Sequence, residues 1–450
     1  TIDTFYTNSE GYLITPEVLP YGEYLLVEVQ APYGYALDST PVSFTVSADN
    51  AEKENALTVI KVRKENTAQK GKISVQKTGD IFTSVNMASS AYTDENGELV
   101  VNSTTYTPVF ANGNLSGAVF QVIAAEDIVT LDGTVHANAG DVVAEITTDE
   151  NGYAETDLLY LGKYEIKEVQ APYGYVRNSE SQFVELTYAG QEIAVLDTVN
   201  ASFVNDYQSV EISLSKVMEN DELFGIGNNN EYLSVRFGLF AAEDIQAADG
   251  TVIPADGLLS EVSLAENMTA RFDVQIPFGR YYVKEISTDE HYVLGGEKYL
   301  VNFEYMGQDI RTVDIDCGQF VNLLKRGRIE GHKVDDKSEP LENAVFGLFT
   351  ADCVKFSRDT AIMTFTSDEN GYFVFDEIPY GEYIIHEIET PTGYIFSDES
   401  YPVTVSEDGD VVEITAVNKP ITVEISKRDV YGKELVGAEM VLENADGETV

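Results

Sequence analysis

The sequence predicts an all-β protein built as a linear array of tandem β-sandwich modules. A block of similar residues recurs four times along the 450 residues. Apolar residues alternate with a period of two, which is typical of strands, and helical periodicity is hard to find. Turn signals of the Asx-Gly type separate the apolar runs at the spacing of short strands. Each module should therefore be a sandwich of about seven short strands.

The best-preserved block is the octapeptide EVQAPYGY, which is identical at 28–35 and 168–175. Related forms are EIETPTGY at 387–394 and EISTDEHY, which starts at Glu285. In all four copies a Gly-x-Tyr-x-apolar-x-Glu pattern ends at the leading glutamate. Turn signals precede three of the copies, with the sequences NSEGY at 8–12, DENGY at 149–153 and DENGY at 368–372. Such clusters between alternating apolar runs predict hairpins.

Two shorter elements mark the ends of the modules. An alternating strand ends in lysine at Lys77, Lys216, Lys333 and Lys427. An apolar run closes with asparagine at Asn66, Asn205, Asn322 and Asn418. The interval from each asparagine to the next lysine is eleven residues at the first three boundaries and nine at the last. Asparagine is therefore expected to end one module, and lysine to lie in the first strand of the next.

These boundaries divide the chain into three complete modules between two half-modules. The complete modules span 70–206, 207–324 and 325–420, while 1–69 resembles a C-terminal half and 421–450 an N-terminal half. Joining the last residue to the first continues the pattern: the lysine-to-glutamate interval is 51 residues in the joined copy and 54 in 325–420. Two explanations remain open: one four-module period of a longer repetitive array, or separate chains that assemble head to tail.

Alternation also places three polar residues of each module on the core-facing side of its strands. The triads are Lys77/Glu168/Asn205, Lys216/Glu285/Asn322 and Lys333/Glu387/Asn418. Burying such side chains is costly without partners. One interpretation is a buried Lys–Glu ion pair capped by an amide, or lysines that extend toward solvent. The other is covalent, because burial favours a neutral amine and a protonated carboxyl group.

In the covalent interpretation, the lysine amine attacks the asparagine carboxamide while the glutamate polarises its oxygen and carries a proton to the departing ammonia. Folding makes this encounter intramolecular. Each module would form one Lys–Asn isopeptide bond, without turnover. A fourth triad, Lys427 with Glu28 and Asn66, can form only across copies or chains.

The lysine strand, the Gly-x-Tyr-x-apolar-x-Glu box followed by APxGY, and the final asparagine resemble the Cna-B (SpaA-like) isopeptide-forming domains of Gram-positive surface adhesins and pilins. The resemblance implies an immunoglobulin-like sandwich of the prealbumin (inverse Ig) type, with the bond joining its first and last strands. Three departures stand out. Residues 207–324 lack the APxGY tail and the DENG turn, Gly331 replaces an apolar residue before Lys333, and Lys64 precedes Asn66 on the same face.

Composition and resemblance together predict a load-bearing extracellular stalk or fibre of a Gram-positive bacterium. With 28 Lys+Arg against 77 Asp+Glu, the net charge of −49 disfavours binding to nucleic acid or an anionic membrane surface. No apolar run is long enough to insert into a bilayer. The alternative is an adhesin in which insertion 78–116, expected as a long loop, binds a host or fibre ligand. An enzyme is not expected, since no nucleophile–base pair or phosphate loop is present.

Other residues have simpler explanations, and no cofactor or metal is expected. Cys317-Gly318-Gln319 resembles a thioester motif, but alternation places Cys317 on the outward face. A Cys317–Cys353 disulfide would link neighbouring modules. The DENG turns lack the further acidic ligands of a calcium loop, although weak calcium binding at module junctions remains open. The four histidines have no metal-ligand spacing.

Overall fold

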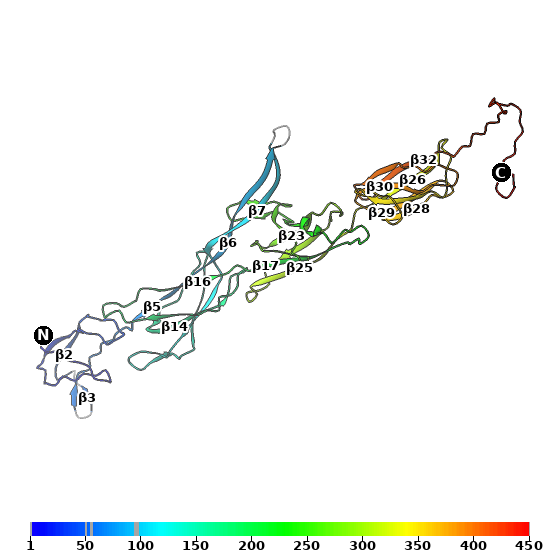
Figure 1. The fold of residues 1–450 in the computed structure, drawn as a ribbon. Helices are drawn as coiled ribbons and strands as arrows, with labels where there is room; N and C mark the ends of the chain where they lie inside the picture. The colour runs from blue at the N-terminus through cyan, green and yellow to red at the C-terminus, as the bar shows by residue number, and fades with distance from the viewer. Residues whose placement is uncertain (1, 50–51, 55–56, 94–98, 450) are drawn as a thin grey trace.

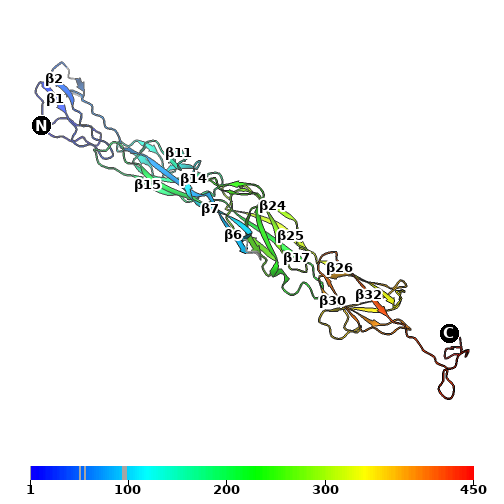
Figure 2. The ribbon, with the colours of Figure 1, turned by 90° about the horizontal axis from the view of Figure 1, so that it is seen from above.

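The computed structural model describes residues 2–49, 52–54, 57–93 and 99–449. These residues form an elongated row of β-sandwich modules with the two termini at opposite ends (Figures 1 and 2). The only helix among them is a short 3-10 turn, η1 (Glu231–Ser234). None of the described segments is a helix long and apolar enough to cross a bilayer. The all-β prediction is confirmed.

Residues 70–206 fold into two facing sheets. One has the order β12–β6–β16, and the other has the order β11–β8–β14–β15. Between them, Phe120, Ile166 and Phe203 pack in the core. The strands are β5 (Lys70–Gly71), β6 (Ile73–Thr93), β8 (Val119–Ala124), β9 (Ile128–Val129), β10 (Val135–Ala137), β11 (Val142–Thr147), β12 (Tyr153–Glu155), β13 (Leu159–Tyr160), β14 (Gly162–Gln170), β15 (Gln182–Leu186) and β16 (Val199–Asn205).

Residues 207–324 repeat this arrangement, with sheets β22–β17–β25 and β21–β18–β23–β24 around their own core. The strands are β17 (Ser209–Met218), β18 (Arg236–Ala241), β19 (Ile245–Gln246), β20 (Val252–Ile253), β21 (Leu258–Ser263), β22 (Thr269–Phe272), β23 (Gly279–Ser287), β24 (Lys298–Phe303) and β25 (Thr312–Asn322).

Residues 325–420 form the third sandwich, with sheets β29–β26–β32 and β28–β27–β30–β31. The strands are β26 (Arg326–Asp335), β27 (Val345–Thr350), β28 (Met363–Thr366), β29 (Tyr372–Pro379), β30 (Gly381–Glu389), β31 (Ser400–Val405) and β32 (Val411–Asn418). In all three modules the first and last strands pair in parallel, as β6–β16, β17–β25 and β26–β32.

Insertion 78–116 is not the long loop that the sequence suggested. β6 continues to Thr93 and pairs in antiparallel fashion with β7 (Leu99–Asn114). The sequence TDENG at 93–97, another turn signal of the Asx-Gly type, begins at the last residue of β6, and residues 94–98 are outside the described part of the chain. Serine and threonine hydroxyls pair across this ribbon, for example Ser90 with Ser103. The turn signal between two strand-forming runs therefore marked a hairpin.

The β6–β7 ribbon also joins two modules. Its strand β7 pairs with β21 through Thr105 and Leu258, so one continuous sheet passes from the first complete module into the second. Val85 on β6 is 8% exposed and packs in the core of residues 207–324. Its backbone N–H donates to Oγ1 of Thr251 at 2.9 Å. The ribbon is therefore a brace that holds two neighbouring sandwiches together (Figure 1).

The expectation that Cys317 faces outward is wrong. Its side chain is 1% exposed and packs in the core of residues 207–324. The register between β17 and β25 shifts next to Gly318, which has a φ of 75° and marks a bulge. A bulge inserts one residue and reverses which side chains face inward. Both cysteines are free, so the Cys317–Cys353 disulfide is absent.

The two half-modules differ in how much of the sandwich they form. In the first, β1 (Gly22–Leu26) pairs with β2 (Val42–Val46) in antiparallel fashion, as β14 pairs with β15. The other strands there are β3 (Glu52–Glu54) and β4 (Leu57–Val59). Residues 421–449 contain no strand and extend away from the last sandwich (Figure 1).

Candidate functional site

Each complete module holds one lysine, one glutamate and one asparagine in its interior. The lysine lies on the first strand of the module, the asparagine ends the last strand, and the glutamate comes from the neighbouring four-stranded sheet. None of the nine side chains belongs to a residue more than 3% exposed. They are Lys77, Glu168 and Asn205; Lys216, Glu285 and Asn322; and Lys333, Glu387 and Asn418.

In each cluster the lysine Nζ contacts the side-chain oxygen of the asparagine. Lys216 Nζ donates to Asn322 Oδ1 at 2.6 Å, and the same bond joins Lys77 to Asn205 and Lys333 to Asn418. The strands that carry these residues are adjacent and parallel, which brings together side chains 128, 106 and 85 residues apart. The amine therefore lies next to the carboxamide group in every complete module.

The glutamate bridges the other two members. Its Oε1 lies 3.1, 2.9 and 3.4 Å from the lysine Nζ in the three successive modules. The same oxygen accepts a hydrogen bond from the asparagine Nδ2 at 3.0, 2.8 and 3.0 Å. A single carboxyl oxygen thus contacts both the amine and the amide nitrogen, which is where a group that moves a proton between them must be.

Aromatic rings and burial keep the lysines away from water. Lys77 Nζ lies 5.7 Å from the ring centre of Phe120, and Lys333 Nζ lies 5.7 Å from that of Phe346. Burial lowers the pKa of Lys77, Lys216 and Lys333 below the ordinary value of 10.5, against the opposing effect of the neighbouring glutamate. The environment therefore favours the neutral amine, the form that acts as a nucleophile.

The second oxygen of each glutamate is held by a backbone group that the sequence analysis did not identify. Oε2 of Glu168 accepts from the N–H of Asn178 at 2.7 Å. Glu285 and Glu387 make the same bond to residues ten positions later, Gly295 at 2.9 Å and Ser397 at 3.2 Å. This bond fixes the carboxyl group so that Oε1 points at the amine and the amide. Because the three donors are of different residue types, nothing in the sequence marked this bond.

The DENG turns support the lysine strand. Gly152 has a φ of 69°, and its carbonyl accepts from the N–H of Lys77 at 2.7 Å. A Cβ added at Gly152 would lie 2.3 Å from the Lys77 carbonyl oxygen, so only glycine fits this close approach. Gly371 holds Lys333 in the same way at 2.7 Å. These turns therefore have a positioning role that sequence reasoning explained only as turn chemistry.

Residues 207–324 lack a DENG turn, but the backbone N–H of their lysine still binds a turn carbonyl. Met268 has a φ of 61°, and its carbonyl accepts from the N–H of Lys216 at 2.8 Å. The departure at Gly331 is also compensated, because the ring of Phe373 occupies the space where a side chain would lie. The missing sequence features therefore do not disturb the geometry of these two clusters.

A threonine distinguishes two of the clusters from the first. Asn322 Nδ2 donates to Oγ1 of Thr288 at 2.8 Å, and Asn418 Nδ2 donates to Oγ1 of Thr390. Each threonine lies three residues after its glutamate, where the first cluster has Ala171. The change from alanine in EVQA to threonine in EIST and EIET was visible in the sequence. The hydrogen bond from the asparagine to that threonine was not predictable from it.

The fourth predicted triad is incomplete within the chain. Asn66 Nδ2 donates to Oε2 of Glu28 at 2.7 Å, and the same oxygen accepts from the N–H of Asp38 at 3.0 Å. Lys64, which precedes Asn66 on this face, binds Asp38 at 2.6 Å instead. Lys427 is exposed and lies in the C-terminal segment, at the opposite end of the molecule (Figures 1 and 2).

The DENG turns and the Cys317-Gly318-Gln319 motif do not form the ligand or thioester sites considered from the sequence. In the DENG turn at 149–153, Oδ1 of Asp149 accepts from the N–H groups of Asn151 and Tyr153 at 2.8 and 2.9 Å. Within the described residues, no group of three or more His, Cys, Asp or Glu side chains is arranged to hold a metal ion. Cys317 is enclosed in a core while Gln319 is exposed, so the thioester motif is not assembled.

Comparison with known proteins decides the family. The SpaA prealbumin-like fold domain matches residues 1–61, 102–200 and 327–420, more than half of the chain. The chain belongs to this SpaA family. Residues 207–324 lie outside the matched regions, yet their seven-stranded arrangement is the same as that of the two matched sandwiches. The prealbumin-type fold and the predicted family are therefore confirmed.

Individual relatives of this SpaA chain are bacterial surface proteins. It is 30% identical over 96 residues to the trypsin-resistant surface T6 protein of Streptococcus pyogenes, covering 21% of this chain and 17% of that protein. It is 22% identical over 263 residues to a collagen adhesin of Staphylococcus aureus, covering 54% of this chain and 20% of the relative. The chain thus spans about a fifth or less of the length of either protein.

Among solved structures, the SpaA array resembles the Bacillus anthracis TIE protein. The two share 19% identity with a TM-score of 0.52, and the alignment covers 90% of this chain and 76% of the other. This likeness extends over almost the whole row of modules. It shows that the fold is shared.

Proposed function

We propose that this chain is a load-bearing segment of a stalk or fibre on the surface of a Gram-positive bacterium, with each complete module stapled by its own Lys–Asn isopeptide bond. One observation carries the proposal. Three sandwiches of different sequence each bury a lysine, a glutamate and an asparagine in mutual contact, between the first and last strands.

The proposed reaction is an amide exchange that needs no added reagent. The neutral lysine Nζ attacks Cγ of the asparagine, the new C–N bond forms, and the bond from Cγ to Nδ2 breaks. One amine proton stays on the new amide, and the other reaches the leaving nitrogen through the glutamate, so that ammonia departs. Because Oε1 of the glutamate contacts both nitrogens, no other side chain has to move the proton.

An unreacted buried ion pair is the simpler explanation of the same residues. It accounts for the Lys–Glu contacts, and an amide cap would also turn its oxygen to the amine and its nitrogen to the acid, but it does not require the same three residue types on the same three strands of every complete module. That orientation is the same in all three clusters. Recurrence of the complete geometry favours the reactive interpretation.

The mechanical consequence follows from the position of the bond. Force along the row enters a sandwich by its first strand and leaves by its last strand. A bond from Lys77 to Asn205 would carry that force past the 127 residues between them. Those residues could then not be pulled out of the sandwich. Unlike a disulfide, the amide would not be reduced.

Intact mass spectrometry of the purified chain tests the proposal. We expect a mass that is lower than the sequence mass by three molecules of ammonia. Glu168→Gln should reduce the loss from three molecules of ammonia to two, because the carboxyl group that moves the proton in the first complete module is gone. Glu185→Gln, on an exposed position of β15, is the matched control and should still show three losses. Tryptic mapping should find the Lys–Asn pairs. An unmodified mass for the natural chain would overturn the proposal.

Direct ligand binding is the second candidate function. The β6–β7 ribbon rises from the side of the row, where it is accessible (Figure 1). Because one relative is named a collagen adhesin, collagen is the first ligand to test. If the ribbon binds collagen, replacing residues 86–107 by a short turn should abolish saturable collagen binding. The loss of three molecules of ammonia should remain unchanged. Binding that survives the replacement would exclude the ribbon.

A further inference from the structure

A bulge follows the glutamate of every complete cluster. Strict alternation would place the third residue after the glutamate on the opposite side of the sheet from it. In each of the three modules, however, the strand pairing shifts by one position directly after the glutamate. The residues skipped by the pairing are Val169, Ile286 and Ile388. A bulge inserts one residue and redirects the side chains beyond it, so the third residue can face the same side as the glutamate.

That third residue is a threonine in two clusters and an alanine in the first. Thr288 and Thr390 follow directly after the strands that carry the glutamates, β23 and β30. Their Oγ1 atoms accept hydrogen bonds from Asn322 Nδ2 at 2.8 Å and from Asn418 Nδ2. Ala171 has the same place after β14 and carries no hydroxyl. The clusters share their lysine, glutamate and asparagine and differ in this one polar contact.

The threonine completes the hydrogen bonding of the nitrogen that would leave as ammonia. A carboxamide nitrogen carries two hydrogens. In the second cluster, Asn322 Nδ2 donates to Glu285 Oε1 at 2.8 Å and to Thr288 Oγ1 at 2.8 Å. In the first cluster, the only acceptor that the described residues offer to Asn205 Nδ2 is Oε1 of Glu168. One N–H group is therefore left without a protein acceptor there.

The second acceptor would assist the proposed reaction in two ways. Rotation of a carboxamide about its Cβ–Cγ bond is only weakly restricted, so a second hydrogen bond helps to keep Cγ facing the amine. The leaving nitrogen also gains positive charge as the glutamate delivers its proton. A hydrogen bond from a charged donor is stronger than one from a neutral donor. A contact that strengthens as the reaction proceeds lowers the barrier.

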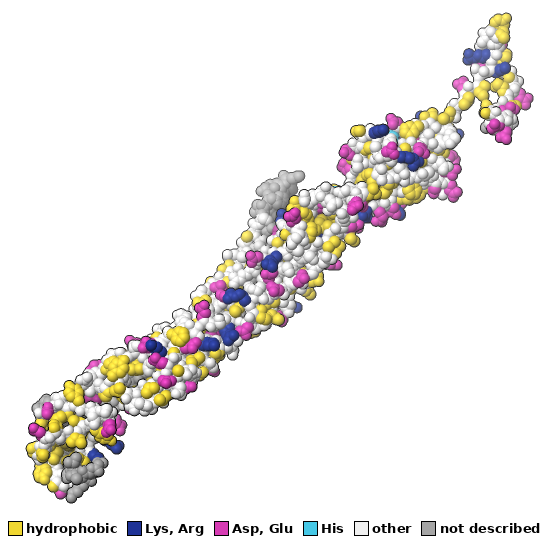
Figure 3. Space-filling view, turned by 60° about the horizontal axis from the view of Figure 1, so that its bottom comes forward, with side chains coloured by type: hydrophobic (Ala, Val, Ile, Leu, Met, Phe, Trp, Pro, Cys, Tyr) yellow, Lys and Arg dark blue, Asp and Glu magenta, His cyan; other side chains and the backbone are white. Residues whose placement is uncertain are grey.

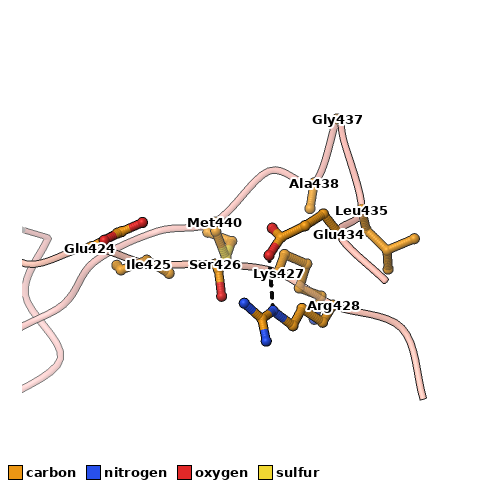
Figure 4. A pocket seen from close by; sticks show the side chains of 10 residues that line it. All are labelled: Glu424, Ile425, Ser426, Lys427, Arg428, Glu434, Leu435, Gly437, Ala438 and Met440. Carbon is orange, nitrogen blue, oxygen red and sulfur yellow. Dashed lines mark hydrogen bonds and ion pairs between the residues drawn. The ribbon is translucent and has the colours of Figure 1, made fainter. Parts of the chain in front are cut away.

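Enclosure makes this contact important. Lys and Arg side chains lie scattered among acidic ones on the surface of the row, where water can supply hydrogen bonds (Figure 3). Lys427 is an exposed example, and it lies beside Arg428 and Glu434 in an open groove (Figure 4). The lysine, glutamate and asparagine of the second and third clusters are at most 3% exposed. Protein groups must therefore accept the hydrogens of a nitrogen in these clusters.

We propose that Thr288 and Thr390 are further catalytic residues of the second and third clusters, which hold the leaving nitrogen while the Lys–Asn bond forms. This inference rests on the function proposed above. The threonine hydroxyl neither gains nor loses a proton. The bond from Nζ to Cγ forms, the bond from Cγ to Nδ2 breaks, and the glutamate carries the proton to the departing ammonia. The first cluster has to react without this contact.

Cell-free synthesis of the full chain tests this inference, because it provides molecules whose clusters have not yet reacted. Samples are quenched in acid at successive times, and tryptic mapping gives the half-time of each Lys–Asn bond. Thr390→Val removes the hydroxyl and keeps the size of the side chain. It should slow the bond between Lys333 and Asn418 about tenfold, the effect expected from losing one hydrogen bond to a charged group. The other two bonds of the same molecule are internal standards and should keep their rates.

Three further variants separate the hydroxyl from the packing of the side chain. Thr390→Ser keeps the hydroxyl and should restore most of the natural rate. Thr392→Val, at an exposed position two residues later, is the matched control and should leave all three rates unchanged. Ala171→Ser adds a hydroxyl to the first cluster and should accelerate the bond between Lys77 and Asn205. Such a gain cannot come from damage to the fold.

The outcomes distinguish this inference from the proposed function. A natural rate in Thr390→Val would overturn the inference while the three cross-links remain. Equally slow reaction of Thr390→Ser and Thr390→Val would also overturn it, because the shape of the side chain rather than its hydroxyl would then set the rate. A natural chain that keeps all of its ammonia would overturn the proposed function, and this inference with it.

Discussion

Gln308 and Ala171 are joined across the boundary between two modules. The side-chain Oε1 of Gln308 accepts from the N–H of Ala171 at 2.8 Å, and the backbone carbonyl of Gln308 accepts from the N–H of Arg177 at 2.9 Å. Gln191 makes the equivalent bond to Ala31 at 2.9 Å in the preceding junction. Both alanines belong to an EVQAPYGY block, so the most conserved block of the repeat also connects neighbouring modules.

Gln308→Ala should loosen this junction. The N–H of Ala171 would lose its partner, and an unpaired, partly buried N–H costs about 1–3 kcal/mol. Small-angle X-ray scattering should show a shorter mean end-to-end distance, because the row can bend. Gln246→Ala, on an exposed position of the same module, is the control. Identical scattering from the two variants would show that this bond does not set the shape of the row.

Lys333→Met should destabilise the third sandwich by removing its proposed staple. The bond would close a loop of 86 residues, and losing it should cost about 4–5 kcal/mol by analogy with a disulfide. Calorimetry should show one unfolding transition at lower temperature, while the transitions of the other modules remain. Lys337→Met, exposed in the turn after the same strand, should change little. Equal behaviour of both variants would argue against a load-bearing bond at Lys333.

The pH dependence of stability should reveal the buried amine when the bond is prevented. In Glu387→Gln the lysine stays unreacted, and burial lowers its folded-state pKa below the ordinary 10.5. Between these two pKa values the unfolded chain binds more protons, so stability should rise with pH across that window and fall as the pH drops through the folded pKa. Denaturant titrations should show this slope. It should vanish in the double variant with Lys333→Met, and its persistence there would assign it to another group.

Val85→Ala should weaken the brace between two sandwiches. Val85 comes from the ribbon of residues 70–206 but packs in the core of 207–324, so a smaller side chain leaves a cavity in the neighbouring module. We expect a loss of about 1–2 kcal/mol in the unfolding transition of residues 207–324. Met87→Ala, two residues later and 70% exposed, is the control. An equal effect of both would mean that the ribbon does not stabilise its neighbour.

The two cysteines should differ in reactivity. Burial raises the pKa of the Cys317 thiol to about 11, whereas Cys353 is partly accessible. A thiol reagent at neutral pH should therefore label the native chain once, at Cys353, and twice after denaturation. Peptide mapping identifies the site. Rapid native labelling of Cys317 would contradict its enclosure in the core.

Several features of the site required more than strand alternation. The burial of Cys317 depends on a bulge at Gly318, and no period-two pattern reports where an extra residue is inserted. Met268 takes the place of the turn glycine and adopts a left-handed backbone conformation. Nothing in the sequence of residues 207–324 predicted that a methionine would do so. The bond from Asn178 to Glu168 links a loop to a strand, so it becomes visible only when both are placed.

Strand alternation and the internal repeat were enough to predict the all-β class, the array of modules and the inward-facing side chains of the regular strands, because a strand turns alternate residues to opposite sides. The three-dimensional arrangement was needed to show that Lys77 meets Asn205, that the β6–β7 ribbon packs on the next sandwich, and that Glu28 and Lys427 lie at opposite ends of the row (Figure 1). These relationships depend on the parallel pairing of distant strands and on how successive sandwiches are stacked. Both arise from packing among residues far apart in the chain, which local patterns do not encode.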